Sequence, residues 1–410
     1  MTSASCRFCG SRLDVVFADL GMSPLANSYV PPERANAMEP FYPLRALVCQ
    51  ECLLVQLEEF ETAEAIFSDY AYFSSYSTTW LEHSRRYVEQ MIERWGLDGE
   101  SQVVEIASND GYLLQYFVER GVPVLGIEPA ANVAEVAVEK GVPTLVEFFG
   151  VQTAENLAAH RRADLLLGNN VLAHVPDLND FVGGMKVLLA ERGVVTMEFP
   201  HLLRLIEDNQ YDTIYHEHFS YFSFLTVRQV FAAHGMRLFD VEELDTHGGS
   251  LRIYGAHIED DTKPETDRAR ELLAREQAAG LGDIGTYRAY AERVQTDKRD
   301  TLEFLIGLKR DGRSIVGYGA PAKGNTLLNY CGIGTDFLDY TVDLNPHKQG
   351  HLLPGSHVPI RPVEALRETR PDVVVILPWN LRDEIVEQHA YVREWGGRFA
   401  ARSPELRLLP

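Results

Sequence analysis

Two closely spaced pairs of cysteines near the start of the chain constrain its fold more than any other feature. Cys6 and Cys9 form the first pair, Cys49 and Cys52 form the second, and two residues separate the members of each pair. This spacing lets both thiolates of a pair reach one ion, and two pairs complete the tetrahedral sulfur shell that zinc prefers. The long interval between the pairs predicts a small zinc-bound domain with an insertion. Because sulfur would occupy every position, we expect this zinc to be structural.

The cysteines also indicate the cellular compartment. Two disulfides in a secreted protein are the main alternative to a zinc site, and an iron–sulfur or redox site is a further one. The first residues lack the unbroken apolar run of a signal peptide, so we expect a cytoplasmic protein with metal-bound thiols. Cys331, the fifth cysteine, has no partner in the sequence and is predicted to be a small buried core residue.

Length and charge exclude several classes of partner. A chain of 410 residues is too long for one ordinary core, so we expect several domains. There are 60 acidic and 38 basic residues, a formal net charge of -22, whereas a protein that binds a nucleic-acid duplex needs a basic face. No apolar stretch approaches the ~20 residues that span a bilayer. We therefore expect a protein that binds neither nucleic acid nor a membrane. We further expect a monomer or a weak homo-oligomer.

The chain divides into three predicted regions. Residues 1–65 hold the cysteine pairs, residues 66–264 alternate short β-branched runs with amphipathic helical runs, and residues 265–410 contain a helical connector and a second αβ unit. Such alternation is typical of parallel sheets covered by helices, so the expected fold class is α/β. The predicted strands are 103–107, 123–128, 163–169 and 193–199 in the second region and 313–319, 339–344 and 372–380 in the third.

The connector is predicted to be helical over residues 265 to about 311. Apolar side chains recur in it at helical spacing, which indicates a buried seam. The residues of this seam are Tyr287, Ala291, Val294, Leu302, Leu305 and Leu308.

The turn after the strand at 103–107 carries a nucleotide-type pattern. It would place backbone N–H groups and a helix N-terminus at the carboxyl edge of a parallel sheet, where ligands of such folds bind. The next strand ends at Glu128, a carboxylate that can accept hydrogen bonds from both ribose hydroxyls. The G-x-G-x-x-G pattern of NAD sites is absent from this turn. The alternative is an ordinary αβ connection with a solvated Glu128.

The order of Glu105, Gly111 and Glu128 resembles the S-adenosylmethionine site of class I methyltransferases. Asn169 and Asn170, which follow a later strand, are expected near the methionine end of that cofactor. The candidate cofactor-binding residues are Glu105, Ala107, Asn109, Gly111, Glu128, Asn169 and Asn170.

A more specific resemblance extends over essentially the whole chain. The motifs that carry it are CRFCG, the second CxxC, YAYFSSYS, EIASNDG, LGIEP, NNVLAHVPD, YHEHFSYFS, HGGSLR, GYGAPAKG and LPWN, in this order. The chain resembles the sugar C-methyltransferases that act on nucleotide-linked 4-keto-6-deoxy sugars. The resemblance implies a small zinc domain at 1–65, a central class I methyltransferase domain at 66–264 and a Rossmann-like domain at 265–410 that helps to hold the nucleotide sugar.

The chain departs from this family's pattern at two places. Ala107 and Ser108 stand where a glycine is common in the cofactor turn, and His216 stands where at least the tetronitrose-type members carry an acid. The second departure leaves the exact sugar open. Thymidine diphosphate is the usual nucleotide in the family, and methylation at carbon 3 is favoured, with carbon 5 as the alternative.

The chemistry of this family requires a base. Removal of the proton beside a ketone gives an enolate that attacks the sulfonium methyl group, with a donor near the carbonyl oxygen. Imidazole titrates near neutral pH, so His218 is the predicted base. By resemblance, Tyr215, Glu217 and His218 match the family's Tyr-x-Glu-His active-site motif, in which Tyr215 would bind the sugar and Glu217 would orient local groups. His174 likewise matches an active-site histidine close to the carbonyl.

Two assignments around this motif have alternatives. One of Tyr70, Tyr72 and Tyr76 is expected to face the sugar, with Tyr72 as our choice, and interdomain packing is the other interpretation. His216 and His218 would point the same way in an extended segment, which leaves a second metal site open. No further acidic or histidine partner stands at suitable spacing.

The second αβ unit contains a further anion-binding pattern. Gly317 and Gly319 follow a predicted strand, and Lys323 lies in the helix that comes next, which suits a pyrophosphate. By resemblance this unit binds the nucleotide sugar through Gly319, Ala320, Lys323 and Asn380. A glycine turn needed only for packing is one alternative. An NAD site, with Asp343 as the ribose-binding acid, is another and would make the chain an oxidoreductase or epimerase; a noncatalytic zinc-assembled interaction module is a further one.

Overall fold

The computed structural model describes residues 4–62, 74–76, 78–402 and 405–410. They form two compact units, and each unit is assembled from separate stretches of chain. The first contains residues 1–13, 49–202 and 219–282, and the second contains residues 14–48, 203–218 and 283–410. Within the described ranges, no helix combines the length and the apolar character needed to cross a membrane.

A seven-stranded sheet forms the centre of the first unit, in the order β10-β11-β8-β7-β4-β5-β6. Strands β4 to β8 run parallel, whereas β11 pairs antiparallel with both β8 and β10. The predicted strands of the second region are confirmed, with slightly different ends. The strands are β4 (Val103–Ile106), β5 (Val124–Ile127), β6 (Thr144–Leu145), β7 (Ala163–Asn169), β8 (Leu189–Pro200), β10 (Met236–Leu244) and β11 (Ser250–His257).

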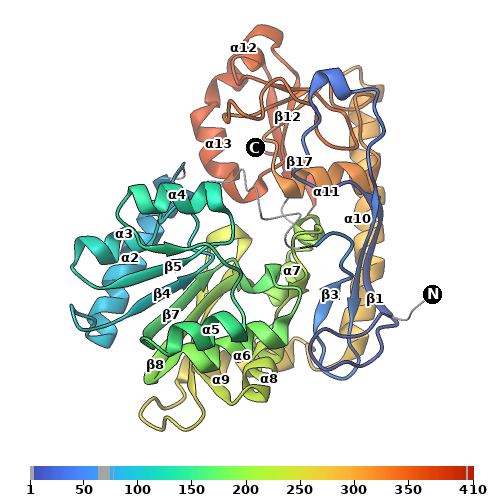
Figure 1. The fold of residues 1–410 in the computed structure, drawn as a ribbon. Coiled ribbons are helices and arrows are strands. Elements are labelled where there is room, and N and C mark those ends of the chain that lie inside the picture. The colour runs from blue at the N-terminus through green and yellow to red at the C-terminus, as the bar shows by residue number, and fades with distance from the viewer. Residues whose placement is uncertain (1–3, 63–73, 77, 403–404) are drawn as a thin grey trace. The chain divides into compact units, whose positions relative to one another are not determined.

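Helices cover both faces of this sheet (Figure 1). One face carries α2 (Thr78–Trp95), α3 (Leu114–Glu119) and α4 (Ala131–Glu139). The other carries α5 (Val151–Ala158), α6 (Leu178–Leu188) and α8 (Phe224–Ala233), and α9 (Asp267–Ala278) packs against α8 and β10. Tyr87 of α2 and Phe117 of α3 are fully buried against the sheet, so these helices and the parallel strands share one close-packed hydrophobic core.

The second unit contains a six-stranded sheet in the order β14-β13-β12-β15-β16-β17, in which only β17 is antiparallel. The second αβ unit expected from the sequence is therefore confirmed. Its strands are β12 (Ile315–Tyr318), β13 (Thr341–Val342), β14 (Ile360–Arg361), β15 (Val373–Ile376), β16 (Arg398–Arg402) and β17 (Leu406–Leu408). Its helices are α11 (Ala322–Cys331), α12 (Ala365–Thr369) and α13 (Arg382–Gln388). Cys331, at the end of α11, is buried as predicted.

The interval between the cysteine pairs belongs to this second unit. It forms β1 (Val15–Ser23) and β2 (Tyr42–Val48), which pair antiparallel, and the long helix α10 (Ile284–Arg310) packs on β1. Phe17 stacks on Tyr290 with 4.5 Å between ring centroids. This aromatic contact anchors the β1–β2 hairpin on α10, so core packing holds the interval in addition to the cysteine pairs at its two ends.

The connector is helical, as predicted, but it contains two helices. It is divided into α9 and α10 because Gly280 adopts φ 85° and ends α9. Tyr287, Val294 and Leu305 of the predicted seam are buried, whereas its other three residues are only partly buried.

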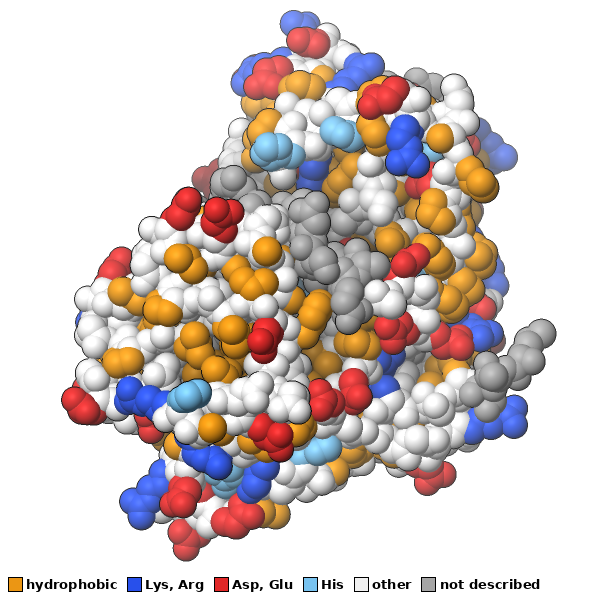
Figure 2. Space-filling model, viewed as in Figure 1, with side chains coloured by type: hydrophobic (Ala, Val, Ile, Leu, Met, Phe, Trp, Pro, Cys, Tyr) orange, Lys and Arg blue, Asp and Glu red, His pale blue; other side chains and the backbone are white. Residues whose placement is uncertain are grey.

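The remaining elements are short. They are β3 (Val55–Leu57), β9 (Ser220–Tyr221), α7 (Leu202–Glu207) and the 3₁₀ turns η1 (Pro32–Arg34), η2 (Ser74–Tyr76), η3 (Leu172–His174), η4 (Tyr211–Thr213), η5 (Thr246–Gly248), η6 (Trp379–Leu381) and η7 (Ala390–Trp395). On the visible face of the molecule, acidic and basic side chains are interspersed (Figure 2).

Candidate functional site

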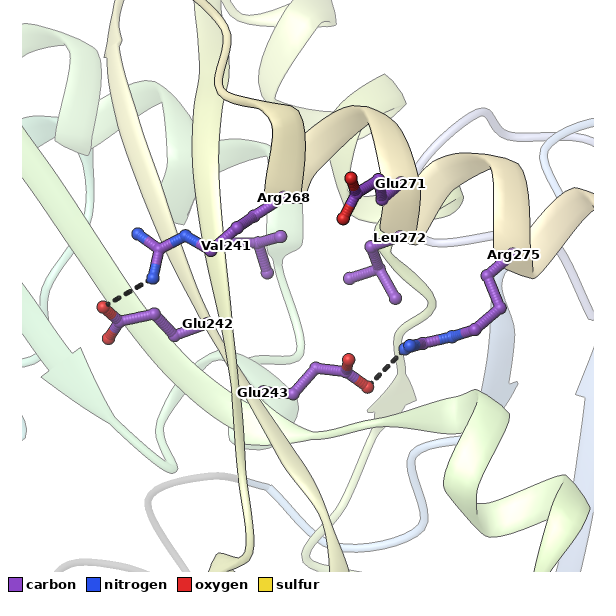
Figure 3. Close-up of a pocket in the computed structure, with 7 residues that line it drawn as sticks. All are labelled: Val241, Glu242, Glu243, Arg268, Glu271, Leu272 and Arg275. Atoms are coloured by element: carbon purple, nitrogen blue, oxygen red, sulfur yellow. Dashed lines mark hydrogen bonds and ion pairs between the residues drawn. The ribbon is translucent and has the colours of Figure 1, made fainter.

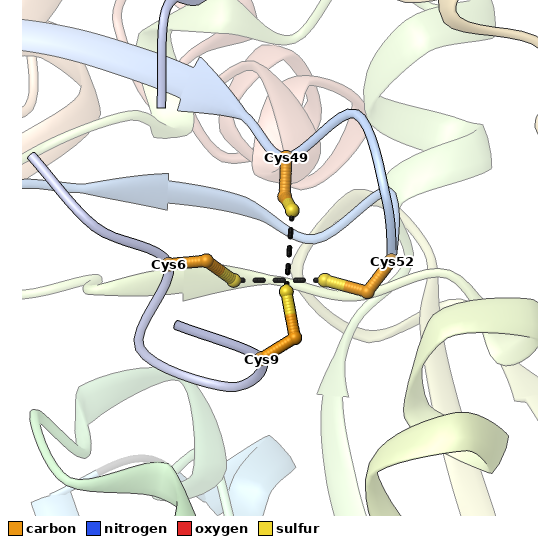
Figure 4. A group of neighbouring side chains, drawn as sticks. All are labelled: Cys6, Cys9, Cys49 and Cys52. Carbon is orange, nitrogen blue, oxygen red and sulfur yellow. Dashed lines mark hydrogen bonds between the residues drawn. The ribbon is translucent and has the colours of Figure 1, made fainter. Parts of the chain in front are cut away.

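The four cysteines of the two pairs converge on one point in the first unit (Figure 4). Their sulfur atoms all lie within 4.8 Å of one another. Cys6 lies 3.6 Å from Cys52 and Cys9 lies 3.4 Å from Cys49, and no disulfide joins them. Sulfurs bound to one zinc at about 2.3 Å stand at similar separations, so the residues fit a tetrahedral zinc ion.

The zinc centre is supported by buried polar contacts. Gln56 donates a hydrogen bond from Nε2 to the sulfur of Cys6 at 3.2 Å and accepts one from the backbone of Arg7 at 2.9 Å. The Arg7 guanidinium in turn donates to the carbonyls of Leu57 and Pro176. The hydrogen bond between Cys6 and Cys52 lowers the pKa of Cys6 and raises that of Cys52, because the two sulfurs share one proton.

The candidate cofactor turn follows β4 and is built from left-handed backbone. Ala107, Asn109 and Gly111 have φ values of 57°, 49° and 73°. Ala107 thus adopts a conformation that favours glycine, which is the residue common at this place in the family. At Gly111 a side chain would also meet Val142 at 3.0 Å and Ala137 of α4 at 3.3 Å, because the end of α4 approaches closely here. The turn lies at the carboxyl edge of the sheet, where the N–H groups of Ser108, Asn109 and Gly111 donate to Ile127, Glu128 and Ser108 and so fix its shape.

Glu128 lies at the end of β5, beside this turn. Its two carboxylate oxygens accept hydrogen bonds from the backbone N–H groups of Asn109 and Ala130, each at 2.9 Å. Burial raises the pKa of Glu128, and these two hydrogen bonds oppose that effect. Each oxygen retains a further lone pair, so the carboxylate can still accept the two hydrogen bonds that a ribose diol would donate.

The other predicted cofactor residues lie along the same edge. Glu105, in β4, is fully buried, and burial raises its pKa well above the usual range. Asn169 ends β7 and donates a long hydrogen bond of 3.5 Å to the hydroxyl of Tyr112. Asn170 has φ 55°, and its N–H donates to the carbonyl of Glu198 at 2.7 Å. His174 follows in the partly buried turn η3, so the structure places it within the cofactor unit.

A buried ion cluster at the end of β8 was not predicted. Glu198 stands opposite Asn169 in the sheet, and its carboxylate contacts Arg252 at 3.0 Å and His83 at 3.1 Å. Thr246 donates to the other oxygen at 3.1 Å. No spacing rule connects these residues, and a lone glutamate in an apolar strand was the only signal available from the sequence. The cluster neutralises a charge that burial would otherwise destabilise.

The Tyr-x-Glu-His motif lies in the second unit. The hydroxyl of Tyr215 and Nε2 of His218 are 3.0 Å apart, and the ring centroids lie 4.2 Å apart with the ring planes tilted by 34°. His216 points elsewhere, and its Nε2 lies 3.2 Å from the carbonyl oxygen of Pro43. Burial lowers the pKa of His216, which favours neutral imidazole there. The structure brings the predicted base and tyrosine together and directs His216 away from a shared metal position.

Glu217 is nearly buried between these residues. Asn27, from the interval between the cysteine pairs, donates a hydrogen bond from Nδ2 to Oε1 of Glu217 at 2.7 Å. Burial raises the pKa of Glu217, and the hydrogen bond from Asn27 opposes this. Sequence reasoning did not single out Asn27, because 190 residues separate it from its partner.

The predicted anion-binding turn connects β12 to α11. Gly319 has φ 90°, and a side chain there would meet Pro378 at 2.6 Å, so close packing requires this glycine. Lys323 donates to Oδ1 of Asn380 at 2.8 Å, which brings two predicted ligands together. Burial lowers the pKa of Lys323 to about 8. An anion that bound there would stabilise the charged ammonium.

Asp343 takes a structural role in this turn. Its Oδ2 accepts a hydrogen bond from the N–H of Ala320 at 2.7 Å, and its Oδ1 accepts one from the N–H of Asn345 at 2.8 Å. The carboxylate thus fixes the backbone of the turn. Tyr70 and Tyr72, which were candidates for the sugar contact, lie outside the described residues, as does the side chain of Tyr76.

A hollow of 280 Å³ between β10 and α9 contains none of the predicted residues (Figure 3). Arg268 and Arg275 reach across it to Glu242 and Glu243, so these charges are paired with one another. We therefore place the functional site at the strand ends and turns rather than in this hollow.

Three family models match the chain. A methyltransferase domain covers residues 80–241, a zinc binding domain covers residues 6–67, and a C-methyltransferase C-terminal domain covers residues 245–404. Together with the sheet order, the turn after β4 and the sulfur cluster, they define the class: an S-adenosylmethionine-dependent methyltransferase with a zinc-binding domain.

The relatives narrow this class. The chain is 37% identical to C-methyltransferase NovU from Streptomyces niveus over 407 residues, which cover 98% of this chain and 96% of NovU. It belongs to this C-methyltransferase family. A ubiquinone biosynthesis O-methyltransferase from Rhodopseudomonas palustris (strain BisA53) is 28% identical over 97 residues, 23% of this chain and 38% of that protein.

Solved methyltransferase structures also match part of the chain. Magnesium protoporphyrin IX methyltransferase from Synechocystis PCC 6803 with bound SAH matches 43% of this chain and 83% of its own, at 13% identity and a TM-score of 0.36.

Proposed function

We propose that the methyl acceptor is a nucleotide-linked 4-keto-6-deoxy sugar and that the methyl group is added to the carbon beside its ketone. The contact between the two predicted substrate elements of the second unit carries this proposal. Thr326 of α11, the helix that follows the anion-binding turn, donates a hydrogen bond to the carbonyl of Ile214 at 3.0 Å, next to Tyr215. A diphosphate at the turn and a sugar at the Tyr-x-Glu-His motif would thus belong to one ligand.

The proposed reaction needs a base for a weakly acidic C–H bond. S-adenosylmethionine supplies the electrophilic methyl group. His218 takes the proton from the carbon beside the ketone, and the electron pair of that C–H bond passes into an enolate stabilised at the carbonyl oxygen. The enolate carbon then forms the new bond to the methyl group as the sulfur–carbon bond breaks. His218 finally releases its proton to solvent.

The neighbours of His218 suit this role. The hydroxyl of Tyr215 lies at Nε2 and holds the ring, so a sugar hydroxyl that hydrogen-bonds Tyr215 would be directed to the base. Glu217 adds a carboxylate beside the base, where it favours the imidazolium that forms on proton transfer. His174 is proposed to assist at the carbonyl oxygen.

Binding of the cofactor gives a direct test of the turn after β4. Glu128→Ala is expected to weaken S-adenosylmethionine binding by roughly 1–3 kcal/mol, because the ribose hydroxyls lose their acceptor. Calorimetric titration measures the change. Glu139→Ala, at the exposed end of α4, is the control and should bind normally. Equal affinity in the Glu128 variant and the control would move the cofactor site elsewhere.

The substrate is tested by methyl transfer. Isotope-labelled S-adenosylmethionine is incubated with a panel of 4-keto-6-deoxy sugars linked to thymidine or uridine diphosphate, and NMR assigns the methylated carbon. We expect transfer to a thymidine diphosphate sugar at carbon 3, with carbon 5 as the alternative product. Absence of transfer to every 4-keto sugar would refute the proposed acceptor.

A further inference from the structure

The segment at residues 24–30 contacts both predicted substrate elements of the second unit. Asn27 holds Glu217, and the hydroxyl of Tyr29 donates to the carbonyl of Ala320, in the anion-binding turn, at 2.6 Å. Lys348 donates to the same carbonyl at 2.9 Å and lies 5.2 Å from the centre of the Tyr29 ring. The segment therefore connects the turn at Gly319 to the Tyr-x-Glu-His motif.

Asn27 is held from both sides along the chain. On one side, Asn325 of α11 donates to the carbonyl of Ala26 at 2.6 Å. On the other, Val30 forms a two-way backbone bridge with Leu352, with N–O distances of 3.0 and 2.8 Å. These contacts limit the positions of the Asn27 amide although its side chain is exposed. An amide fixed in this way loses little entropy when it donates to a carboxylate.

The charge of Glu217 depends on few groups. Among the described residues, no lysine or arginine forms an ion pair with it, and Asn27 is the side chain that donates a hydrogen bond to it. Burial of a carboxylate favours its neutral form, whereas a donor at 2.7 Å favours the ionised form. The next residue in the chain is His218, and a carboxylate there supports an imidazolium only when it is ionised.

We propose that Asn27 is a positioning residue of the methylation site, which keeps Glu217 ionised and oriented beside the base. This inference rests on the proposed function, because it gives Glu217 a task in proton removal. It assigns part of the interval between the cysteine pairs to the active site rather than to the zinc centre.

Infrared titration tests the proposal without any substrate. The carboxylic-acid band that Glu217→Gln removes from the spectrum reports the protonation of Glu217. In Asn27→Ala this band should persist to a pH about one unit higher than in the wild type, because loss of a donor to a charged acceptor raises the pKa. Asn27→Asp, which sets a second carboxylate against Glu217, should shift the band further. Asn156→Asp, the same change on the exposed face of α5, should leave it in place.

Turnover supplies a second readout. The acid limb of kcat/KM for methyl transfer should move to higher pH by the same amount in Asn27→Ala, with KM for S-adenosylmethionine unchanged. In a Glu217→Gln background, Asn27→Ala should no longer shift the limb, because the titrating group is gone. Asn27→Ser, which retains a shorter donor, should fall between Asn27→Ala and the wild type.

The outcomes separate this inference from the proposed function. An unshifted infrared band in Asn27→Ala overturns the inference. A loss of rate by one factor at every pH also overturns it, because that is the behaviour of a structural residue. If no 4-keto sugar is methylated, the proposed acceptor is refuted while the infrared titration still decides the role of Asn27.

Discussion

His218→Asn is expected to lose turnover by about 10²–10⁴ fold while it binds S-adenosylmethionine and the sugar normally. Asparagine fills a similar space and keeps a donor toward Tyr215, but it cannot accept the substrate proton at neutral pH. In the wild type, the hydroxyl of Tyr215 lies 3.0 Å from Nε2 of His218. Exchange of the α-proton with deuterated water should fall by a similar factor, since exchange requires the same enolate.

The matched variant is His174→Asn, which changes a histidine of the first unit. It should reduce turnover less, because a residue that assists at the carbonyl oxygen does not take the proton. One experiment that follows deuterium exchange and methyl transfer in both variants gives the ranking. If His218→Asn retains near-normal rates while His174→Asn is inactive, the two roles are reversed.

Loss of one zinc ligand is expected to have the largest effect on stability. A complete structural zinc site contributes apparent binding energy on the order of 10 kcal/mol, and this energy is available only to the folded domain. Cys49→Ser removes one of the four sulfurs, so zinc content should fall from one ion per chain and the melting temperature should drop markedly. Elemental analysis and thermal unfolding measure the two effects. Stability should fall before the chemical step is affected, because the sulfur shell leaves no position for substrate.

Cys331→Ala is the control for this variant. Cys331 is buried in the second unit, whereas the four clustered cysteines belong to the first, so the variant should keep one zinc per chain. Its melting temperature should change only by the amount expected for a small cavity. Freshly purified wild-type protein without zinc would contradict the assignment of the centre.

Local patterns in the sequence determined much of the first unit. The spacing of Cys6, Cys9, Cys49 and Cys52 predicted the sulfur cluster, because ligands two residues apart converge wherever the chain can turn. Runs of β-branched residues predicted β4, β5, β7 and β8 of one sheet and β12, β13 and β15 of the other, because burial on two faces requires apolar side chains throughout. The motif order predicted the enzyme class through its resemblance to a known family.

Two features of the fold were not predicted: the break between α9 and α10, and the unit to which residues 14–48 belong. Helical periodicity continued across residues 265–311, but two glycines around Leu281 end one helix before the next begins. Periodicity reports which face of a helix is apolar, and it does not report a break that preserves the spacing. No local pattern could assign residues 14–48 to a unit. They lie between the two cysteine pairs and yet belong to the second unit.

By itself, the sequence determined the sulfur cluster and the central parallel strands, because these depend on spacing and on the apolar character of short segments; the class of enzyme was indicated by resemblance to a known family. The tertiary structure alone decided which distant side chains meet. Asn27 reaches Glu217 and Tyr29 reaches Ala320 because β1 packs on α10, while the segment that follows β1 is tied to α11 and Leu352. Contacts between residues so far apart along the chain depend on the packing of whole elements, and no local rule of spacing encodes that packing.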